Sequence, residues 1–292
     1  MFEKENVYNE QLNVELPRGI TIFVKREDLL HEEVSGNKFR KLKYNILKAK
    51  ELGYSKLLTF GGAYSNHIAA TAAAGRICGI ETIGIIRGEE LEDNYAGNAT
   101  LIKAVTDGMQ LGFMTRTEYR QKADEVIIDK LKQKYGEFYL VPEGGTNEEA
   151  IRGTEEILKE DDYTFDYVCT AVGTGGTIAG IINSSRDNQT IIGFPALKGN
   201  FLYEDIRKFV TNSNWQLVLD YHFGGYAKYN EELLSFLRQL YKDTGILFDP
   251  IYNGKMIYGV LEEIKKGKFK DNSRILVIHT GGVQGWNEKI KI

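Results

Sequence analysis

Three short segments combine glycine with small hydroxyl residues directly after an apolar run. They are TFGGAYSN at 59–66, AVGTGGT at 171–177 and IHTGG at 278–282. In open α/β sheets, ligands bind beyond the carboxyl ends of the strands, and glycine there lets backbone N–H groups approach an anion closely. Each segment alone is also consistent with a tight turn that holds no ligand. Together they predict a site for a small anionic molecule.

The segment GTGGT, residues 173–177, is the most typical of a phosphate-binding loop, because it offers consecutive amides and two hydroxyls where the helical pattern IAGIIN begins. A dinucleotide loop matches less well, since Ile178 stands where the third glycine of G-x-G-x-x-G is needed and the run 190–197 ends without an acidic residue. A Walker loop has a lysine directly after its last glycine, and no lysine follows the glycines here. The pattern predicts a phosphate without a nucleotide.

The segment SGNKFRKLKYN, residues 35–45, begins a helix with many cations. The N–H groups at a helix start carry partial positive charge, so Lys38, Arg40, Lys41 and Lys43 are unfavourable there unless an anion binds nearby. An amine among cationic neighbours has a lowered pKa and can attack a carbonyl, which makes Lys38 a candidate Schiff-base lysine. The alternative is that Lys38 is a solvated surface charge, as most lysines are.

The elements that must position these residues alternate between short β-branched runs and longer helical patterns, which indicates α/β architecture with largely parallel sheets. We predict strands within 19–28, 56–62, 82–88, 109–115, 137–145, 167–176, 190–197, 215–226 and 275–282. We predict helices within 37–53, 65–79, 94–105, 154–160 and 231–245, and one starting near residue 178.

The four predicted strands between Lys56 and Gly145 can form a small open sheet of their own, and the later strands a second sheet that the N-terminal strand joins. We therefore predict a large domain of residues 1–38 and 152–292 and a small domain of residues 39–151. A cleft between two such domains is the usual place for a small-molecule site.

The composition excludes several classes of function. A net charge of −4 over 292 residues gives no electrostatic reason to bind nucleic acid or an acidic membrane surface. Cys78 and Cys169 lie far apart in apolar stretches, as free buried thiols do, and no apolar run has signal-peptide or membrane-spanning length, so we expect a cytoplasmic protein. The histidines, which are His31, His67, His222 and His279, lack ligand spacing, so we expect no metal site.

Five motifs together are similar to one enzyme family. SGNKFRKLKYN, TFGGAYSNH, AVGTGGTIAG, DPIYNGKM and HTGG occur in the order and approximate spacing of the 1-aminocyclopropane-1-carboxylate deaminase/D-cysteine desulfhydrase family, over about Val24 to Gly285. That family belongs to the tryptophan-synthase-β-like, fold type II pyridoxal-phosphate enzymes. The resemblance implies two open, twisted, largely parallel-sheet domains, an active site in the interdomain cleft, the cofactor pyridoxal 5′-phosphate, a small amino-acid substrate and a homodimer.

The resemblance also implies roles for individual residues. Lys38 would form the imine with the cofactor, and Lys41 would help to hold its phosphate. Ser65 would lie near the substrate carboxylate and the reacting carbon, and Asn66 beside the pyridoxal O3′, although both are also good N-cap residues. The remaining implied residues are the phosphate cradle Gly173, Thr174, Gly175, Gly176 and Thr177, the substrate-facing Tyr226 and Tyr252, Asn253 at the ring nitrogen, and Thr280 among the cofactor-binding residues.

Two positions depart from the cyclopropane deaminases, which have Glu against the pyridine nitrogen and Leu in the place of the Thr of HTGG. Here these positions are Asn253 and Thr280. A carboxylate favours a protonated pyridinium, whereas a neutral amide can donate to an unprotonated nitrogen, which predicts a weaker electron sink. The desulfhydrase branch usually has a small hydroxyl residue at the Asn253 position, so the sequence matches neither branch fully.

We therefore expect a lyase that removes an α-proton and eliminates a β-substituent, converting D-cysteine into pyruvate, sulfide and ammonia. The base would be the Lys38 amine or a group positioned with Ser65 and a tyrosine. The first alternative is 1-aminocyclopropane-1-carboxylate deamination to 2-oxobutanoate and ammonia, which needs a stronger electron sink. The second alternative is a non-catalytic ligand-binding or nucleotide-binding protein.

Overall fold

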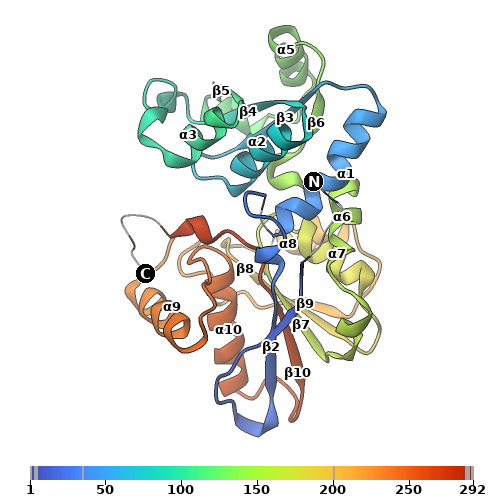
Figure 1. The fold of residues 1–292 in the computed structure, drawn as a ribbon, viewed down its shortest axis with the longest axis vertical. Helices are drawn as coiled ribbons and strands as arrows, with labels where there is room; N and C mark the ends of the chain where they lie inside the picture. Colours follow the sequence, from blue (N-terminus) through green and yellow to red (C-terminus); the bar gives the residue numbers. More distant parts are fainter. Residues whose placement is uncertain (1, 3–5, 35, 200, 287–289, 291–292) are drawn as a thin grey trace. The chain divides into compact units, whose positions relative to one another are not determined.

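The protein divides into two compact units, each built around a sheet of its own (Figure 1). The computed structural model describes residues 2, 6–34, 36–199, 201–286 and 290, so Ser35 of the motif SGNKFRKLKYN lies outside the described residues. Unit 1 comprises Met1–Lys4 and Lys38–Ala150, and unit 2 comprises Glu5–Asn37 and Ile151–Ile292.

Unit 1 contains a four-stranded parallel sheet in the order β5-β4-β3-β6. Its strands are β3 (Lys56–Gly61), β4 (Glu81–Arg87), β5 (Gln110–Met114) and β6 (Tyr139–Val141). Its helices are α2 (Asn66–Cys78), α3 (Ala99–Thr106), α4 (Arg116–Arg120) and α5 (Glu125–Tyr135), with the 3-10 turns η3 (Glu89–Leu91), η4 (Tyr95–Gly97) and η5 (Glu143–Gly145). Two helices cross the boundary between the units, namely α1 (Asn37–Glu51) and α6 (Glu148–Thr154).

Both faces of the unit 1 sheet are covered by helices. Successive side chains of a strand point to opposite faces, so Ile85 packs with Leu131 of α5 while Ile86 packs with Leu101 of α3. In Figure 1, α5 lies on one side of this sheet and α2 and α3 on the other. This two-sided burial explains why β4 reads as a continuous apolar run.

Unit 2 contains a six-stranded sheet in the order β1-β2-β10-β7-β8-β9, in which only the β1 and β2 pair is antiparallel. Its strands are β1 (Asn9–Gln11), β2 (Thr21–Lys25), β7 (Tyr167–Val172), β8 (Thr190–Pro195), β9 (Trp215–Leu217) and β10 (Arg274–Ile278). Its helices are α7 (Gly176–Ser184), α8 (Leu202–Arg207), α9 (Glu231–Thr244) and α10 (Asn253–Lys265), with η1 (Pro17–Gly19), η2 (Glu27–Leu29), η6 (Glu160–Thr164) and η7 (Val283–Gly285).

The central strand β7 organises the unit 2 core, because every one of its residues is buried. Cys169 packs into the cluster that includes α9 and α10, and Val168 packs into the cluster that includes α7 and α8. Unit 2 is therefore a three-layer α/β/α arrangement (Figure 1). The strands β7 and β10 are neighbours, so the loops that follow them are neighbours at the carboxyl ends of the strands.

The predicted strands are confirmed, and so is the separate sheet between Lys56 and Gly145. The prediction of a helix within 154–160 is wrong, because α6 ends at Thr154 and the chain then continues in turns. Ile157 and Leu158 made this stretch look amphipathic, but both are core residues that the turns bury against α7. Among the described residues, no helix combines the length and apolar character needed to cross a membrane.

The close packing of α7 on the end of α6 gives a stability test. A Cβ atom on Gly180 would lie 2.1 Å from Thr154 Oγ1 and 2.7 Å from the Glu155 backbone nitrogen. We expect Gly180→Ala to lower the free energy of unfolding by about 2 kcal/mol, within the usual overpacking range. Chemical denaturation followed by circular dichroism measures this change. Gly97→Ala is the control, because a Cβ there meets no atom within 4 Å, and equal stability of the two variants would contradict the packing argument.

Candidate active site

The loop between β7 and α7 has the geometry of an anion site. Strand β7 ends at Val172 and α7 begins at Gly176, with Gly175 in the left-handed region at a φ of 85°. A Cβ on Gly175 would lie 2.9 Å from Ile206 Cγ1, so the turn also needs the space that glycine leaves. The first N–H groups of α7 lack intrahelical partners and point out of its start together with the positive end of the helix dipole. This end of unit 2 can bind a phosphate through its backbone.

The segment before Lys38 is fixed to this loop. Asn37 Nδ2 donates to Thr177 Oγ1 at 2.8 Å, and the Asn37 backbone N–H donates to the Thr280 carbonyl at 3.2 Å. Gly36 makes this close approach possible, because its φ is +61° and a Cβ would lie 2.0 Å from the Thr280 carbonyl oxygen. Since Asn37 is directly followed by Lys38, the main chain of Lys38 starts one residue away from the glycine loop.

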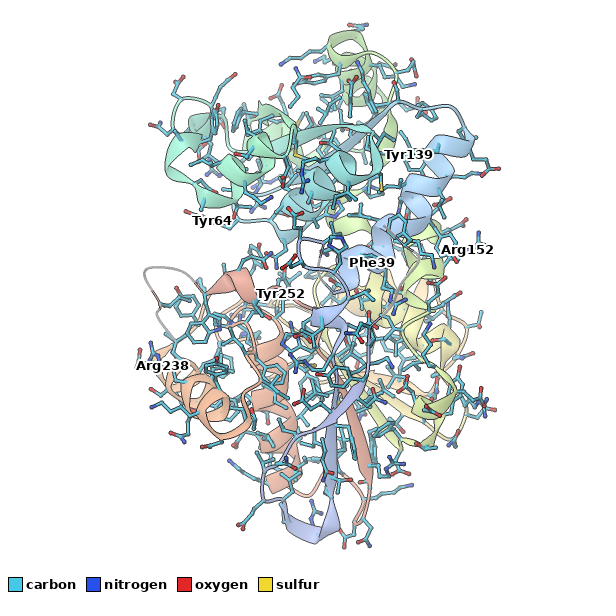
Figure 2. The ribbon with its side chains drawn as sticks, viewed as in Figure 1. Phe39, Tyr64, Tyr139, Arg152, Arg238 and Tyr252 are labelled. Carbon is cyan, nitrogen blue, oxygen red and sulfur yellow. The ribbon has the colours of Figure 1, made fainter. Side chains whose placement is uncertain are left out.

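Two predicted tyrosines also belong to this part of unit 2. Tyr252 immediately precedes α10 (Figure 2), and its Cε1 atom would lie 3.2 Å from a Cβ on Gly173. Tyr226 is 40% exposed, and its ring centroid lies 6.1 Å from that of Tyr252. The structure therefore brings Tyr252 to the glycine loop and Tyr226 next to Tyr252.

The loop that carries Tyr226 is fixed from beneath by a buried lysine. Lys255 Nζ donates to the carbonyls of His222 and Gly225 at 2.9 and 2.8 Å, and burial lowers the Lys255 pKa to about 8. Phe223 has a φ of +50°, an unfavourable value for an aromatic residue that the surrounding bonds must hold in place. The sequence analysis missed Lys255, although it lies inside the motif DPIYNGKM.

Asn253 and Thr280 are in direct contact. Asn253 Oδ1 accepts from the Thr280 hydroxyl at 2.9 Å and from the Thr280 backbone N–H at 3.0 Å. Both hydrogens of Asn253 Nδ2 are also used, on Asp249 Oδ2 and on the Gly281 carbonyl. The Asn253 amide therefore has no hydrogen left to donate to a pyridine nitrogen, contrary to the sequence-based interpretation. That Asn253 contacts the cofactor stays a prediction.

Two lysines predicted from sequence lie together in unit 1. Lys41 Nζ donates to the Gly144 carbonyl at 3.0 Å and to Thr146 Oγ1 at 3.3 Å, and Lys38 Nζ lies 3.4 Å from the same carbonyl. Among the described residues, neither amine forms an ion pair. Two amines thus converge on one carbonyl with no carboxylate to neutralise them.

This crowding changes the electrostatics of three groups. Burial lowers the pKa of Lys38 to about 8 and that of Lys41 well below its ordinary value, with repulsion from Lys38 adding to the second shift. His67 is also buried, and burial and the two lysines hold its pKa well below the usual range. Its Nε2 bonds to Thr59 Oγ1 at 2.8 Å, while its Nδ1 finds no partner among the described residues. A bound anion would relieve this repulsion.

Ser65 and Asn66 lie at the start of α2, two residues and one residue before His67 respectively. The Ser65 hydroxyl accepts from the Ile68 backbone N–H at 3.4 Å, so Ser65 is the N-cap of α2 and the capping alternative holds for it. Its hydroxyl hydrogen remains available as a donor. The preceding residue Tyr64 is 69% exposed (Figure 2), so the start of this helix is open to solvent in unit 1.

Comparison with known proteins places these observations in a family. The model of the family described as pyridoxal-phosphate dependent enzyme matches residues 9–281. The chain belongs to this family. A bifunctional D-cysteine desulfhydrase/1-aminocyclopropane-1-carboxylate deaminase of Arabidopsis thaliana is 31% identical, over 94% of this chain and 75% of that protein.

Two further comparisons agree with this membership. A D-cysteine desulfhydrase of Serratia proteamaculans is 28% identical, over 90% of this chain and 87% of that protein. The crystal structure of an ACC deaminase homologue superimposes with a TM-score of 0.80 at 26% identity, over 97% of this chain and 91% of that one. The fold is thus that of the fold type II pyridoxal-phosphate enzymes, and the protein is a pyridoxal-phosphate dependent enzyme rather than a non-catalytic binding protein.

The residues present fit the cofactor. The start of α7, with the hydroxyl of Thr177, suits its phosphate. The amines of Lys38 and Lys41, which form no ion pair among the described residues, suit its aldehyde and its negative charge. Asn37, which bonds to Thr177, and Lys38 are consecutive in the chain. An anionic ligand of this kind would neutralise the cations at the start of α1.

The lowered pKa of Lys38 can be tested on the cofactor-free protein. An amine with a pKa of about 8 is about one-tenth neutral at pH 7 and half neutral at its pKa, so its reactivity rises with pH through about 8 and levels off about one unit higher. We expect labelling of Lys38 by trinitrobenzenesulfonate, measured by mass spectrometry of its peptide, to be half-maximal near pH 8. Free Nα-acetyl-lysine in the same reaction is the reference. A Lys38 profile that follows this reference would contradict the burial argument.

Proposed function

We propose that the protein degrades a small D-amino acid by β-elimination, with D-cysteine as substrate and pyruvate, sulfide and ammonia as products. The observation that carries the proposal is a buried amine of lowered pKa, Lys38, that directly follows the residue bonded to the glycine loop. The similarity to proteins named D-cysteine desulfhydrase supports the choice of substrate. When bound, pyridoxal phosphate supplies an electrophilic aldehyde and a ring that withdraws electrons from the α-carbon.

The chain's own residues would bind the cofactor through backbone N–H groups, hydroxyls and amines. Backbone N–H groups of Gly176 and Thr177 would hold the phosphate, helped by Lys41. The side chain of Thr177 suits this role, because Asn37 donates to its oxygen and leaves its hydroxyl hydrogen for the phosphate. The other residues proposed to contact the cofactor are Asn66, Gly173, Thr174, Gly175, Asn253 and Thr280.

Proton transfer would be carried by Lys38 and by hydroxyl groups. The neutral Lys38 Nζ would remove the proton from the substrate α-carbon, since its pKa of about 8 is close to the working pH of a general base. The Ser65 hydroxyl, which keeps a hydrogen to donate, would bind the substrate carboxylate. Tyr226 and Tyr252 would face the substrate and exclude water from the leaving sulfide.

A second candidate is the deamination of 1-aminocyclopropane-1-carboxylate to 2-oxobutanoate. The similarity to a bifunctional protein with both activities supports it, and so does the finding that Asn253 does not offer its amide hydrogens to a ring nitrogen. The presence of Thr280 in place of the leucine of the cyclopropane deaminases argues for D-cysteine instead. We therefore place elimination first.

We also propose that residues 1–38 and 152–292 form the cofactor-binding domain and residues 39–151 the small domain, and that the protein is a cytoplasmic homodimer. The two sheets support the division, and the free thiols of Cys78 and Cys169 are compatible with a reducing compartment. The dimer rests on the family resemblance, and light scattering of the purified protein tests it.

The substrate proposal is tested by steady-state assays of the cofactor-loaded enzyme. We expect sulfide and pyruvate in equal amounts from D-cysteine, little product from L-cysteine, and 2-oxobutanoate from the cyclopropane amino acid at a lower rate. A higher rate of 2-oxobutanoate release than of sulfide release would reverse the order of the two candidates. Turnover of another amino acid, with no product from D-cysteine or from the cyclopropane amino acid, would contradict both candidate functions.

The role of Lys38 is tested by a pair of variants on the same helix. Lys38→Ala is expected to lower kcat by about 10³-fold, because it removes both the covalent attachment point and the base. Lys43→Ala, which removes a cation five residues further along α1, is expected to retain activity. Visible absorbance that borohydride abolishes in Lys43→Ala but that is missing in Lys38→Ala would assign the attachment point independently of turnover. Equal loss in both variants would contradict the assignment.

A further inference from the structure

The buried carboxylate of Asp249 is the anchor of a hydrogen-bond chain that ends at Thr280. Its Oδ1 accepts from the backbone N–H groups of Ile251 and Tyr252, at 2.9 and 2.7 Å. Its Oδ2 accepts from the backbone N–H and the side-chain amide of Asn253, at 2.9 and 2.6 Å. All four contacts are donors, and among the described residues no acceptor is present for a proton on this carboxyl group. Burial raises the pKa of Asp249, but the four donated hydrogen bonds and the start of α10 favour its anionic form, which is the form this geometry fits.

This anchor fixes the orientation of the Asn253 amide. Nδ2 lies between two acceptors, Asp249 Oδ2 and the Gly281 carbonyl at 2.7 Å, and Oδ1 lies against the backbone N–H of Thr280 at 3.0 Å. The reversed amide would place an oxygen against two oxygens and an NH₂ group against an N–H. Because Asn253 is fully buried, water cannot relieve those clashes. The oxygen of this amide must face Thr280.

The orientation of Asn253 determines what the Thr280 hydroxyl can do. Oδ1 offers only lone pairs, so in the 2.9 Å contact the Thr280 hydroxyl is the donor. A hydroxyl has one hydrogen, and this one is used. The outward side of the Thr280 oxygen therefore carries lone pairs alone. Turning its hydrogen outward would remove one of the two hydrogen bonds to a buried oxygen.

The other ionisable groups near this chain do not change its direction. The His279 ring stacks on Phe248, its Nε2 lies 2.8 Å from the Leu247 carbonyl, and its Nδ1 accepts from the Gly281 backbone N–H at 3.3 Å, which places its hydrogen on Nε2. Asp28 lies 3.8 Å from the same Nδ1, but Arg26 already pairs with its carboxylate at 2.8 Å, so it adds no uncompensated charge on that side. The charge that favours a positive group beyond the Thr280 hydroxyl is therefore that of Asp249.

We propose that Asp249 is a positioning residue that, through Asn253, turns the Thr280 hydroxyl hydrogen inward, so that the cofactor's pyridine nitrogen bound against Thr280 is protonated. The inference rests on the proposed function, which puts Asn253 and Thr280 in contact with the cofactor. It takes the ring nitrogen to meet Thr280, because Asn253 already uses both of its amide hydrogens and bonds directly to the Thr280 hydroxyl. A protonated ring donates its N–H to the Thr280 oxygen, and the chain of hydrogen bonds then leads to a buried anion, with each bond strengthening the next.

The test is nitrogen NMR of the holoenzyme loaded with pyridoxal phosphate that carries ¹⁵N in the ring. The ¹⁵N chemical shift distinguishes a protonated from an unprotonated ring without reference to turnover. We expect the protonated signal in the wild-type enzyme at pH 7. An unprotonated signal there would overturn the inference while leaving the proposed function intact, whereas failure to bind the labelled cofactor at all would instead overturn the cofactor assignment.

Two variants locate the cause of the protonation. Asn253→Leu removes the acceptor for the Thr280 hydroxyl and is expected to give the unprotonated signal although Thr280 is still present. Thr280→Ser keeps the hydroxyl and is expected to keep the protonated signal. A protonated ring in Asn253→Leu would show that the chain from Asp249 does not control the nitrogen.

The charge of Asp249 is tested by Asp249→Asn, followed over a range of pH. We expect the pH at which the ring nitrogen loses its proton to fall by about one unit, a tenfold loss of proton affinity. If this variant does not fold, Asp249→Glu in the same titration decides: it retains the anion and is expected to show the wild-type midpoint. A wild-type midpoint in Asp249→Asn, or a fall of the midpoint in Asp249→Glu as large as that expected for Asp249→Asn, would contradict the role of the charge.

Discussion

The bond between the Asn37 side chain and the Thr177 hydroxyl is the constraint on which the proposed chemistry of this protein depends. It fixes the residue before Lys38 to the loop that begins α7, while the Asn37 backbone N–H is fixed to the end of β10. Because a trans peptide separates neighbouring Cα atoms by about 3.8 Å, the attachment of Asn37 places the start of Lys38 one residue from the loop that begins α7, without any further contact. Gly36 is required for the same reason, since any side chain there would overlap the Thr280 carbonyl.

Much of the architecture follows from the sequence because parallel sheets leave a simple pattern. Runs such as YVCTAV and TIGIIR are apolar on both faces, and each is followed by glycine and small hydroxyl residues. The stretch 154–160 was predicted wrongly because Ile157 and Leu158 are buried as parts of turns, and hydrophobic spacing over seven residues cannot distinguish a short helix from such turns. Strand β1 was missed because its three polar residues, Asn9–Gln11, pair at an edge and carry no apolar signal.

The candidate site was predictable in its residue types but not in the direction of its hydrogen bonds. Asn253 and Thr280 could be singled out by their place in the motifs, yet the sequence does not say which end of an amide faces which neighbour. The neighbours that decide this are Asp249, the backbone of Gly281 and Thr280 itself. The expectation of a weak electron sink treated Asn253 as a free donor, and the geometry removes that premise. The balance between elimination and ring opening therefore depends on Thr280.

The lysine beneath the Tyr226 loop has a consequence for how alkaline behaviour is interpreted. Lys255 is buried and its pKa is about 8, so it loses its positive charge in the same pH range as Lys38. A neutral amine still has two hydrogens, and Lys255 faces two carbonyl acceptors, His222 and Gly225. Both hydrogen bonds to this loop can therefore persist after deprotonation, although they lose the strength that the positive charge adds. A fall in the reaction rate at alkaline pH would then reflect the titration of a reacting nitrogen rather than release of the loop that carries Tyr226.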